Sequence, residues 1–320
     1  MKDMNMLGKR LFLFLLAPLL AACAHMSEPA LPWHPLVDKV WDVSARRFVD
    51  PVRVMERAAE SRYVLIGEIH DNAEHHRIQN RILESLVMRG RRPALVMEQY
   101  DIDQQEKLNG IALNKESSVA DKLGGLRQQL RGNWEWRFYE PMVARALSER
   151  LPVIAANMPR ESLRTVAREG YGVLGVGEEA RLMLPDVWSD ARQAQLAREI
   201  INGHCGKIPE HVVDYVTRSQ RARDAIMADK MLMAKRNGVV GIVGRNHARM
   251  DIGIPLYLAA RAPDDPVLSI GLVEVDTPTD PEAYAASKLG QLHDYLWFTT
   301  RPRRTSNPCD SIPDQPKAAS

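Results

Sequence analysis

The sequence predicts an α/β fold: a mainly parallel sheet flanked by helices, with an α-helical insertion subdomain. Short apolar runs rich in β-branched residues alternate with amphipathic stretches, which is typical of parallel strands joined by helical crossovers. One long stretch, residues 158–236, contains helical patterns without a convincing strand, and this indicates an insertion between two strands. An apolar fraction of 45% and a charged fraction of 26% are ordinary for a globular domain.

The order of apolar and amphipathic segments supports each element in turn. Buried strands are predicted at 63–67, 93–98, 152–156, 239–243 and 267–275. Helices are predicted between them at 73–89, 138–150 and 252–262, and within the insertion at 159–169, 177–184, 189–202 and 209–236. The first helix shows the reasoning: its apolar residues recur at intervals of three and four, and Gly90 ends it.

The N-terminus has the pattern of a secretory signal. Lys9 and Arg10 precede an apolar stretch, 11–22, that is about as long as a signal-peptide core and too short for a comfortable membrane span. The stretch ends in Leu20-Ala21-Ala22-Cys23, which resembles the lipobox of bacterial lipoproteins. Cleavage before Cys23 would leave its thiol to carry lipid. An ordinary signal peptide with an incidental Cys remains the alternative.

These features divide the chain into four parts. We expect a signal peptide over 1–22, a lipid anchor and tether over 23–40, a folded domain over 41–300 and a loose tail over 301–320. Ala24 rather than Asp follows the Cys, which resembles sorting to the outer membrane, on the periplasmic route. The mature protein would be a soluble domain held on the membrane by lipid.

The charge balance and the cysteine content limit which partners the protein can have and which cellular compartment it occupies. Loss of residues 1–22 leaves 40 basic and 40 acidic residues, and this balance argues against nucleic acid as a partner. If Cys23 carries lipid, Cys205 and Cys309 remain as an even pair in an oxidising compartment. We expect a disulfide between them, with two free thiols as the alternative.

A four-residue pattern, Gly-x-x-His, occurs twice, each time directly after a predicted strand. The copies are Gly67-Glu68-Ile69-His70 and Gly244-Arg245-Asn246-His247. Glu98 and Asn157 follow two further strands in the same way. Open α/β sheets bind ligands at the carboxyl ends of their strands, so these polar groups are expected at one edge. Such a mixture suits a divalent metal, a general acid–base pair or an anionic ligand.

Less specific explanations exist for single residues, and some classes of site have no motif here. Glu98 could pair with an arginine, and His70 could cap the helix that begins near Ala73. His75 and His76 are expected on the solvated face of that helix. The chain contains no His-Glu-x-x-His, Cys-x-x-Cys, Gly-x-Ser-x-Gly or phosphate-binding glycine loop, which argues against zinc peptidase, serine hydrolase and nucleotide-binding sites of those kinds.

Several motifs together resemble the ChaN-like haem-binding lipoproteins of the wider Tiki superfamily, over roughly residues 40–300. They are the first Gly-x-x-His with the following Asp71-Asn72, Met97-Glu98-Gln99, Trp134-x-Trp136-x-x-Tyr139-x-Pro141, Asn157-Met-Pro-Arg160, Gln220-x-x-x-Asp224-x-x-Met227-Ala228 and the second Gly-x-x-His. The resemblance implies an iron-regulated, membrane-anchored protein of haem uptake. It also implies a homodimer that binds paired haems through a Tyr ligand, with a haem-uptake receptor as a possible further partner.

The same superfamily contains enzymes, which gives an alternative function. Tiki proteins resemble metal-dependent proteases with two Gly-x-x-His motifs and a Glu, and erythromycin esterases use a similar Gly-Glu-x-x-His as a general-base site. The matching residues here are Glu68, His70, Glu98 and His247. They would be catalytic residues, or ligands of a divalent metal ion, in a metal-dependent or general-base hydrolase. Arg245 or Asn157 would stabilise a developing oxyanion.

The haem hypothesis needs an iron ligand on the insertion. A phenolate is a hard ligand that suits ferric iron. Tyr171, within Glu-Gly-Tyr-Gly, is the expected ligand and Tyr215 the alternate. The less specific explanation for Tyr171 is a loop or interface aromatic, and the methionines at 227–233 are expected in the core rather than against haem. Haem capture and hydrolysis therefore both remain open from the sequence.

Overall fold

The computed structural model describes residues 34–175, 177–182, 185–275, 292–304 and 308–311. The predicted signal peptide, 1–22, and the predicted lipidation site Cys23 lie outside these residues. Among the residues that the structure does describe, no helix combines the length and apolar character needed to cross a membrane.

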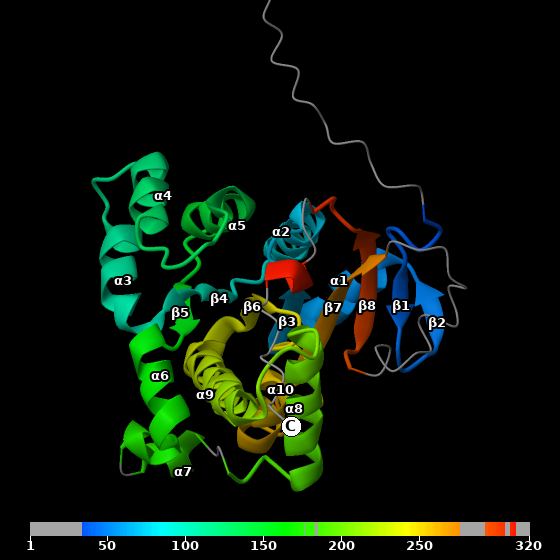
Figure 1. The fold of residues 1–320 in the computed structure, drawn as a ribbon. Helices are drawn as coiled ribbons and strands as arrows, with labels where there is room; N and C mark the ends of the chain where they lie inside the picture. Colours follow the sequence, from blue (N-terminus) through cyan, green and yellow to red (C-terminus); the bar gives the residue numbers. More distant parts are fainter. Residues whose placement is uncertain (1–33, 176, 183–184, 276–291, 305–307, 312–320) are drawn as a thin grey trace, which may run out of the picture. The chain divides into compact units, whose positions relative to one another are not determined.

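The described residues form an eight-stranded, mostly parallel sheet (Figure 1). Its strands are β1 (Val40–Asp42), β2 (Arg47–Val49), β3 (Tyr63–Glu68), β4 (Ala94–Asp101), β5 (Val153–Asn157), β6 (Val239–Gly244), β7 (Val267–Val275) and β8 (Tyr295–Thr300). They lie in the order β2-β1-β8-β7-β3-β6-β4-β5. Neighbours from β8 to β5 are parallel, whereas β1 is antiparallel to β8 and β2. The predicted fold class is confirmed.

Helices cover both faces of the sheet, and this is why its central strands are apolar along their whole length. On one face lie α1 (Pro51–Glu60), α2 (Ala73–Met88) and α5 (Trp136–Ser148), which pack with Val64 and Ile66 of β3. On the other face lie α9 (Glu210–Ala234) and α10 (Ile254–Arg261), which pack with Tyr63 and Leu65. Side chains of a strand alternate between faces, so β3 contributes to both cores.

The remaining helices lie in the two longer connections. Between β4 and β5 the chain forms η1 (Ile102–Gln104), α3 (Gln105–Leu113) and α4 (Val119–Arg127). Between β5 and β6 it forms α6 (Arg160–Glu169), η2 (Tyr171–Leu174), α7 (Glu178–Leu182), α8 (Asp190–Gly203), α9 and η3 (Lys235–Asn237). The described residues between β5 and β6 contain no strand, in line with the helical insertion expected from the sequence. Within this connection α9 contacts α6, α8, α10 and β5 (Figure 1).

The two central strands, β3 and β6, create a crevice at their carboxyl ends. The connection from β3 to β4 runs through α2 on one face, and the connection from β6 to β7 runs through α10 on the other. Adjacent parallel strands whose connections leave in opposite directions form the point where open α/β sheets bind ligands. Gly67 lets the loops meet there, because a Cβ on it would lie 2.8 Å from the Arg245 Cα atom.

Both ends of the described chain are fastened to the body. At the start, His34 and Leu36 are already buried, within the segment expected as tether. At the other end, Arg304 forms hydrogen-bonded ion pairs with Asp71 and Glu274, and a disulfide joins Cys205 to Cys309 with Cα atoms 5.8 Å apart. The described parts of the tail expected over 301–320 are therefore attached at two points.

Candidate functional site

A polar pocket of about 300 Å³ lies in the crevice between β3, β6 and β4. It is lined by Glu68, Ile69, His70, Glu98, Gln220, Arg223, Gly244, Arg245, Asn246 and His247. The four candidate catalytic residues, Glu68, His70, Glu98 and His247, are all among them. The reason is the strand order, in which β3, β6, β4 and β5 are consecutive and parallel.

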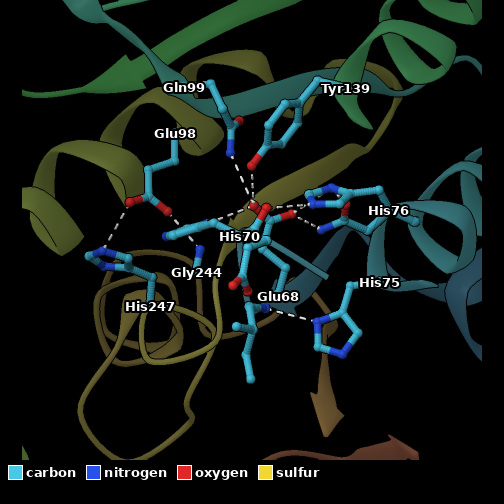
Figure 2. A network of polar contacts seen from close by, with 12 residues as sticks. Glu68, His70, His75, His76, Glu98, Gln99, Tyr139, Gly244 and His247 are labelled. Atoms are coloured by element: carbon cyan, nitrogen blue, oxygen red, sulfur yellow. Dashed lines mark hydrogen bonds and ion pairs between the residues drawn. The ribbon is translucent and has the colours of Figure 1, made fainter. Parts of the chain in front are cut away.

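Glu68 is buried at the end of β3 and held by hydrogen bonds from α2 and α5, which cover the same face of the sheet. Its Oε1 atom accepts from the Tyr139 hydroxyl at 2.7 Å, and its Oε2 atom accepts from Gln79 Nε2 at 2.6 Å (Figure 2). A buried carboxylate without such donors would be costly. The hydrogen bond to Glu68 and the burial of the phenol raise the pKa of Tyr139, so Tyr139 remains a donor.

His70 is the accessible member of the site. Its side chain is 46% exposed, and its Nδ1 atom lies 2.8 Å from Glu68 Oε1. Donation from Nδ1 to the carboxylate leaves Nε2 as a free acceptor toward the pocket. Burial opposes the charged imidazole, but the hydrogen bond to Glu68 and the negative charges of Glu98 and Glu68 outweigh it and raise the pKa of His70. Trp134 packs edge-on against the ring, at 4.7 Å between centroids.

Gly244 is needed for this approach, because a Cβ on it would lie 3.1 Å from the His70 Cε1 atom and 3.5 Å from Glu98 Oε2. The Gly244 amide instead donates to Glu98 Oε2 at 2.6 Å. The glycine of the second Gly-x-x-His motif therefore gives room to the histidine of the first.

Glu98 is buried between cations. Its Oε1 atom accepts a hydrogen bond from the Arg223 guanidinium group. The same oxygen lies 3.5 Å from His247 Nε2, as Figure 2 shows. Burial alone would raise the pKa of this carboxyl, but the charges of His247 and Arg223 hold it well below its usual range. The expected pairing of Glu98 with an arginine thus occurs inside the candidate site. It does not exclude a functional role.

His247 lies between two carboxylates. Its Nδ1 atom is 2.5 Å from Asp224 Oδ1, on the face opposite Glu98. Burial lowers the pKa of His247, but the charges of Asp224 and Glu98 outweigh it and raise the value to about 9. Burial also raises the pKa of Asp224. Two basic side chains, His247 and Arg223, thus face two buried carboxyl groups, Asp224 and Glu98.

This arrangement suits proton transfer better than metal binding. Glu68 orients the His70 ring, whose second nitrogen can act as a base. His247 carries a positive charge across the pocket, so it can act as a general acid or stabilise an oxyanion. Glu98 already has two cations and an amide N–H as partners. No group of three or more His, Cys, Asp or Glu side chains within the described ranges is arranged to hold a metal ion.

The structure changes the expectation for three other residues. Asn157 does not line the pocket, because its Oδ1 atom accepts from Arg223 Nε at 2.9 Å, whereas Arg245 does line it. The expectation that His75 and His76 are solvated is wrong, since both are buried. His75 accepts from the Ile69 amide at 2.9 Å, and burial lowers its pKa to about 3. His76 lies 3.0 Å from the His70 carbonyl oxygen and supports that loop.

Sequence reasoning did not assign Asp224, Arg223, Tyr139 and Gln79 to the site. All four are on helices. Tyr139 and Arg223 are 71 and 125 residues from the glutamates that they contact, whereas Asp224 and Gln79 are 23 and 11 residues from their partners. The sequence offers one sign of their role: Gln220, Arg223 and Asp224 lie within one turn of α9 and so share a side of the helix. This spacing points to the site only once α9 is known to contact β4 and β6.

The two candidate haem ligands lie on the insertion, away from the pocket lining. Tyr171 is in η2, and its ring lies 5.1 Å from the Arg221 guanidinium carbon. Within the described residues the Tyr171 hydroxyl is buried without a hydrogen-bond partner, and burial raises its pKa to about 12. Tyr215 is half-buried on α9. Of the methionines expected in the core, Met227 and Met231 are buried and Met233 is 73% exposed.

A larger groove of about 790 Å³ runs beside η2. It is lined by Ile102, Asp103, Met158, Pro159, Glu161, Ser162, Thr165, Val166, Val173, Leu174, Ile226 and Lys230. The lining is mixed, with apolar side chains from η2, α6 and α9 and one cation, Lys230. Tyr171 is two residues before Val173 in the same short helix, so its segment borders the groove.

Solved structures share this fold. ChaN of Campylobacter jejuni, described with cofacial haem binding, superposes with a TM-score of 0.66 over 82% of this chain and 97% of that chain, at 18% identity. This likeness concerns the fold alone. An erythromycin esterase in its open conformation covers 82% of this chain and 97% of that chain at 14% identity, but its TM-score of 0.45 is too low to support an argument.

Sequence comparison identifies the family. A chloroplastic protein of Arabidopsis thaliana, RETICULATA-RELATED 5, is 24% identical over 281 residues, which cover 78% of this chain and 36% of that protein. The chain thus spans about a third of the length of this curated relative. The family model described as haem-binding uptake, Tiki superfamily, ChaN, matches residues 54–258, more than half of the chain. This chain therefore belongs to the ChaN family of the Tiki superfamily.

Proposed function

We propose that the protein is a haem-binding lipoprotein of the outer membrane that takes part in iron acquisition. Membership of a family described by haem-binding uptake is the observation that carries this proposal. The N-terminal signal pattern ending at Cys23 supports a lipid anchor, and therefore a place on the membrane where haem arrives. The haem itself is proposed to lie on the helical insertion.

The donor set of the insertion fits ferric haem in two respects. The groove beside η2 supplies apolar walls, including Val166, Leu174 and Ile226, and Lys230 supplies a cation for a propionate. Tyr171 supplies a phenol whose buried hydroxyl has no partner among the described residues. Such a group costs about 1–3 kcal/mol, so a ligand that would engage it removes a penalty. Bound ferric iron would favour the phenolate form of that side chain.

The ligand assignment is tested by replacing each tyrosine in turn. Tyr171→Phe is expected to remove the tyrosinate charge-transfer band of the ferric haem complex, and Tyr215→Phe is expected to leave it. Loss of the band in Tyr215→Phe alone would identify Tyr215 as the ligand instead. Sedimentation of the same samples with and without haem tests the proposed homodimer, in which two chains would hold paired haems: a dimer is expected with haem, and a monomer in both samples would contradict it.

The anchor is tested separately from haem. Cells that express the protein are labelled with a fatty acid, and the membranes are fractionated. Label on the wild type in the outer-membrane fraction and none on Cys23→Ser is the expected result. Equal labelling of both proteins would exclude Cys23 as the site of lipidation.

We infer a second candidate function, hydrolysis by general acid–base chemistry, from the polar pocket. The observation that favours it is the arrangement of two histidines in one pocket of about 300 Å³: Glu68 orients the His70 imidazole, and the charged His247 lies opposite. His70 Nε2 would take a proton from water as the water oxygen attacks the carbonyl carbon of a bound ester or amide, and His247 would stabilise the oxyanion that forms. The C–O or C–N bond would then break as the carbonyl re-forms, and His70 would return the proton to the departing alcohol or amine.

A panel of chromogenic esters and amides tests this candidate. His70→Gln and Glu68→Gln should each lower kcat/KM by at least about a hundredfold, because they remove the base or its orientation. His211→Gln, an exposed histidine on α9, is the matched control and should leave turnover unchanged. Absence of turnover in the wild type, or equal turnover in all four proteins, would exclude the assignment.

A further inference from the structure

The loops that enter the parallel strands carry an excess of positive charge. Five of these loops, 60–62, 89–93, 149–152, 235–238 and 261–266, lead into β3, β4, β5, β6 and β7. Together they contain eight Lys or Arg residues and four Asp or Glu residues, although the whole chain is close to neutral. We call the surface that they form the basal surface. It is at the opposite edge of the sheet from the polar pocket.

The loops form one continuous surface because the strand register brings them together. Tyr63 pairs with Val239 and Val267, and Val239 also pairs with Ala94. Backbone hydrogen bonds join the loops themselves, from the Val239 amide to the Arg62 carbonyl at 2.9 Å and from the Ala94 amide to the Gly238 carbonyl at 2.9 Å. The charges are therefore presented at fixed positions.

Three arginines line a depression of about 440 Å³ at the centre of the basal surface. Arg62 donates to the carbonyls of Lys235 and Arg236, and Arg91 donates to the carbonyls of Ala59 and Ser61. These acceptors orient both guanidinium groups. Arg62 also lies 3.8 Å from Asp265 Oδ1, a long ion-pair contact, and Glu60, which lines the depression too, pairs with Arg57. Oriented arginines lose little freedom when they pair with carboxylates, so the depression is prepared for an anionic group.

Some cations of the basal surface have carboxylate partners and others do not. Lys235 pairs with Asp265 at 2.9 Å, Arg261 pairs with Asp229 at 2.7 Å, and Arg92 approaches Glu149 at 3.6 Å. Among the described residues, Arg89, Arg91 and Arg236 have no carboxylate within ion-pair distance, and Arg89 donates to the Ser85 hydroxyl at 3.4 Å. An external anion would therefore meet unbalanced charge at these three arginines.

Two exposed methionines flank the basic residues. Met88, at the end of α2, is 82% exposed, and Met233, near the end of α9, is 73% exposed. These two helices lead into β4 and β6, which are neighbours in the sheet. Met and Arg are the residues enriched in protein interfaces, whereas Lys is depleted, and here seven of the eight cations are Arg.

We propose that the basal surface is a docking surface for a protein partner that presents an acidic segment with apolar side chains. A second copy of this chain fits poorly, because a symmetric contact would oppose like charges. The predominance of Arg over Lys and the two flanking methionines favour a protein partner over a bilayer. A partner on the basal surface would leave the pocket and the groove uncovered.

Binding of a fluorescein-labelled peptide of glutamates with two leucines, followed by anisotropy at near-physiological salt, tests the proposal. The purified protein carries Cys23→Ser so that no lipid is attached there. Arg89→Glu combined with Arg236→Glu should weaken binding at least about tenfold, because both side chains are exposed and unpaired with carboxylates. Lys107→Glu combined with Lys115→Glu, exposed cations in and after α3, is the matched control and should change binding less than about twofold.

The methionines are tested with a second peptide. Met88→Ser combined with Met233→Ser should weaken binding of the leucine-containing peptide and leave binding of an all-glutamate peptide unchanged. No saturable peptide binding, or equal losses in the basal and control pairs, would overturn the proposal. Preferential binding to phosphatidylglycerol vesicles, or self-association that Arg89→Glu abolishes, would overturn it too. Haem titration of the same variants separates this result from the proposed function, since haem binding should not change.

Discussion

At the scale of single residues, two glycines decide whether the strand ends can meet. Gly67 and Gly244 belong to the two Gly-x-x-His motifs, and a side chain on either would enter space already filled by the other motif's loop. The spacing in these motifs is thus a packing requirement as well as a way to place a histidine just beyond a strand.

Replacement of Gly67 by alanine should destabilise the protein. Its new Cβ would lie 2.8 Å from the Arg245 backbone, so the loop must shift, at about 1–3 kcal/mol in the free energy of unfolding. Urea denaturation measures this loss. The control is Gly124→Ala in α4, where a Cβ meets no atom within 4 Å, and which should be neutral or stabilising by up to roughly 1 kcal/mol. Equal midpoints for both variants would show that the crevice does not need its glycine.

The charge balance around His247 gives a pH dependence. The pKa of this histidine is raised from 6.5 to about 9 in the folded state. A raised folded-state pKa contributes stability that is complete below pH 6.5 and is lost as pH rises through about 9. The stability advantage of the wild type over His247→Gln should therefore shrink across that interval. Denaturation curves at several pH values test it, and curves that stay parallel would contradict the assigned charge state.

The site residues that the sequence predicted and those that it did not predict reach the pocket from different kinds of element. Glu68, His70, Glu98 and His247 directly follow strands, and parallel strands end at one edge, so their proximity could be anticipated. Asp224 and Arg223 reach the same pocket from α9. Their place in the site depends on the path that α9 takes across the sheet, and the hydrophobic periodicity of the sequence does not specify that path.

At the scale of elements, apolar runs identified the five parallel strands from β3 to β7, because burial on both faces leaves a continuous apolar signal. The sequence reading missed β1, β2 and β8. The first two have three residues each and lie at the edge of the sheet, so little of the sequence records them. It also missed α1, α3 and α4. Their positions depend on tertiary contacts, of α1 with α2, of α4 with α5, and of α3 with β5 and α4.

The Cys205–Cys309 disulfide joins the C-terminal tail to the segment that follows α8. It closes a loop of 104 residues, and a cross-link of that length restricts the unfolded chain strongly. Cys309→Ser should lower the free energy of unfolding by about 2–5 kcal/mol. Denaturation with and without reductant checks this value: reductant should destabilise the wild type to the level of the variant and leave the variant unchanged. A wild type that is indifferent to reductant would contradict it.

At the scale of the whole folded domain, three surfaces are separate. The polar pocket lies at the carboxyl edge of the sheet, the mixed groove lies on the helical insertion, and the basal surface lies at the amino edge. Haem capture in the groove, acid–base chemistry in the pocket and partner docking at the basal surface can therefore be altered one at a time. Family membership alone could not have revealed that separation.

The central claim, that this protein binds haem on its insertion and away from the Glu/His pocket, is tested by one titration. Ferric haem is added to the purified wild type and to His70→Ala, and absorption spectra are recorded. The account predicts a saturable complex with a high-spin, tyrosinate-type charge-transfer band in both proteins. No saturable complex with the wild type, or loss of the complex in a folded His70→Ala variant, would contradict it.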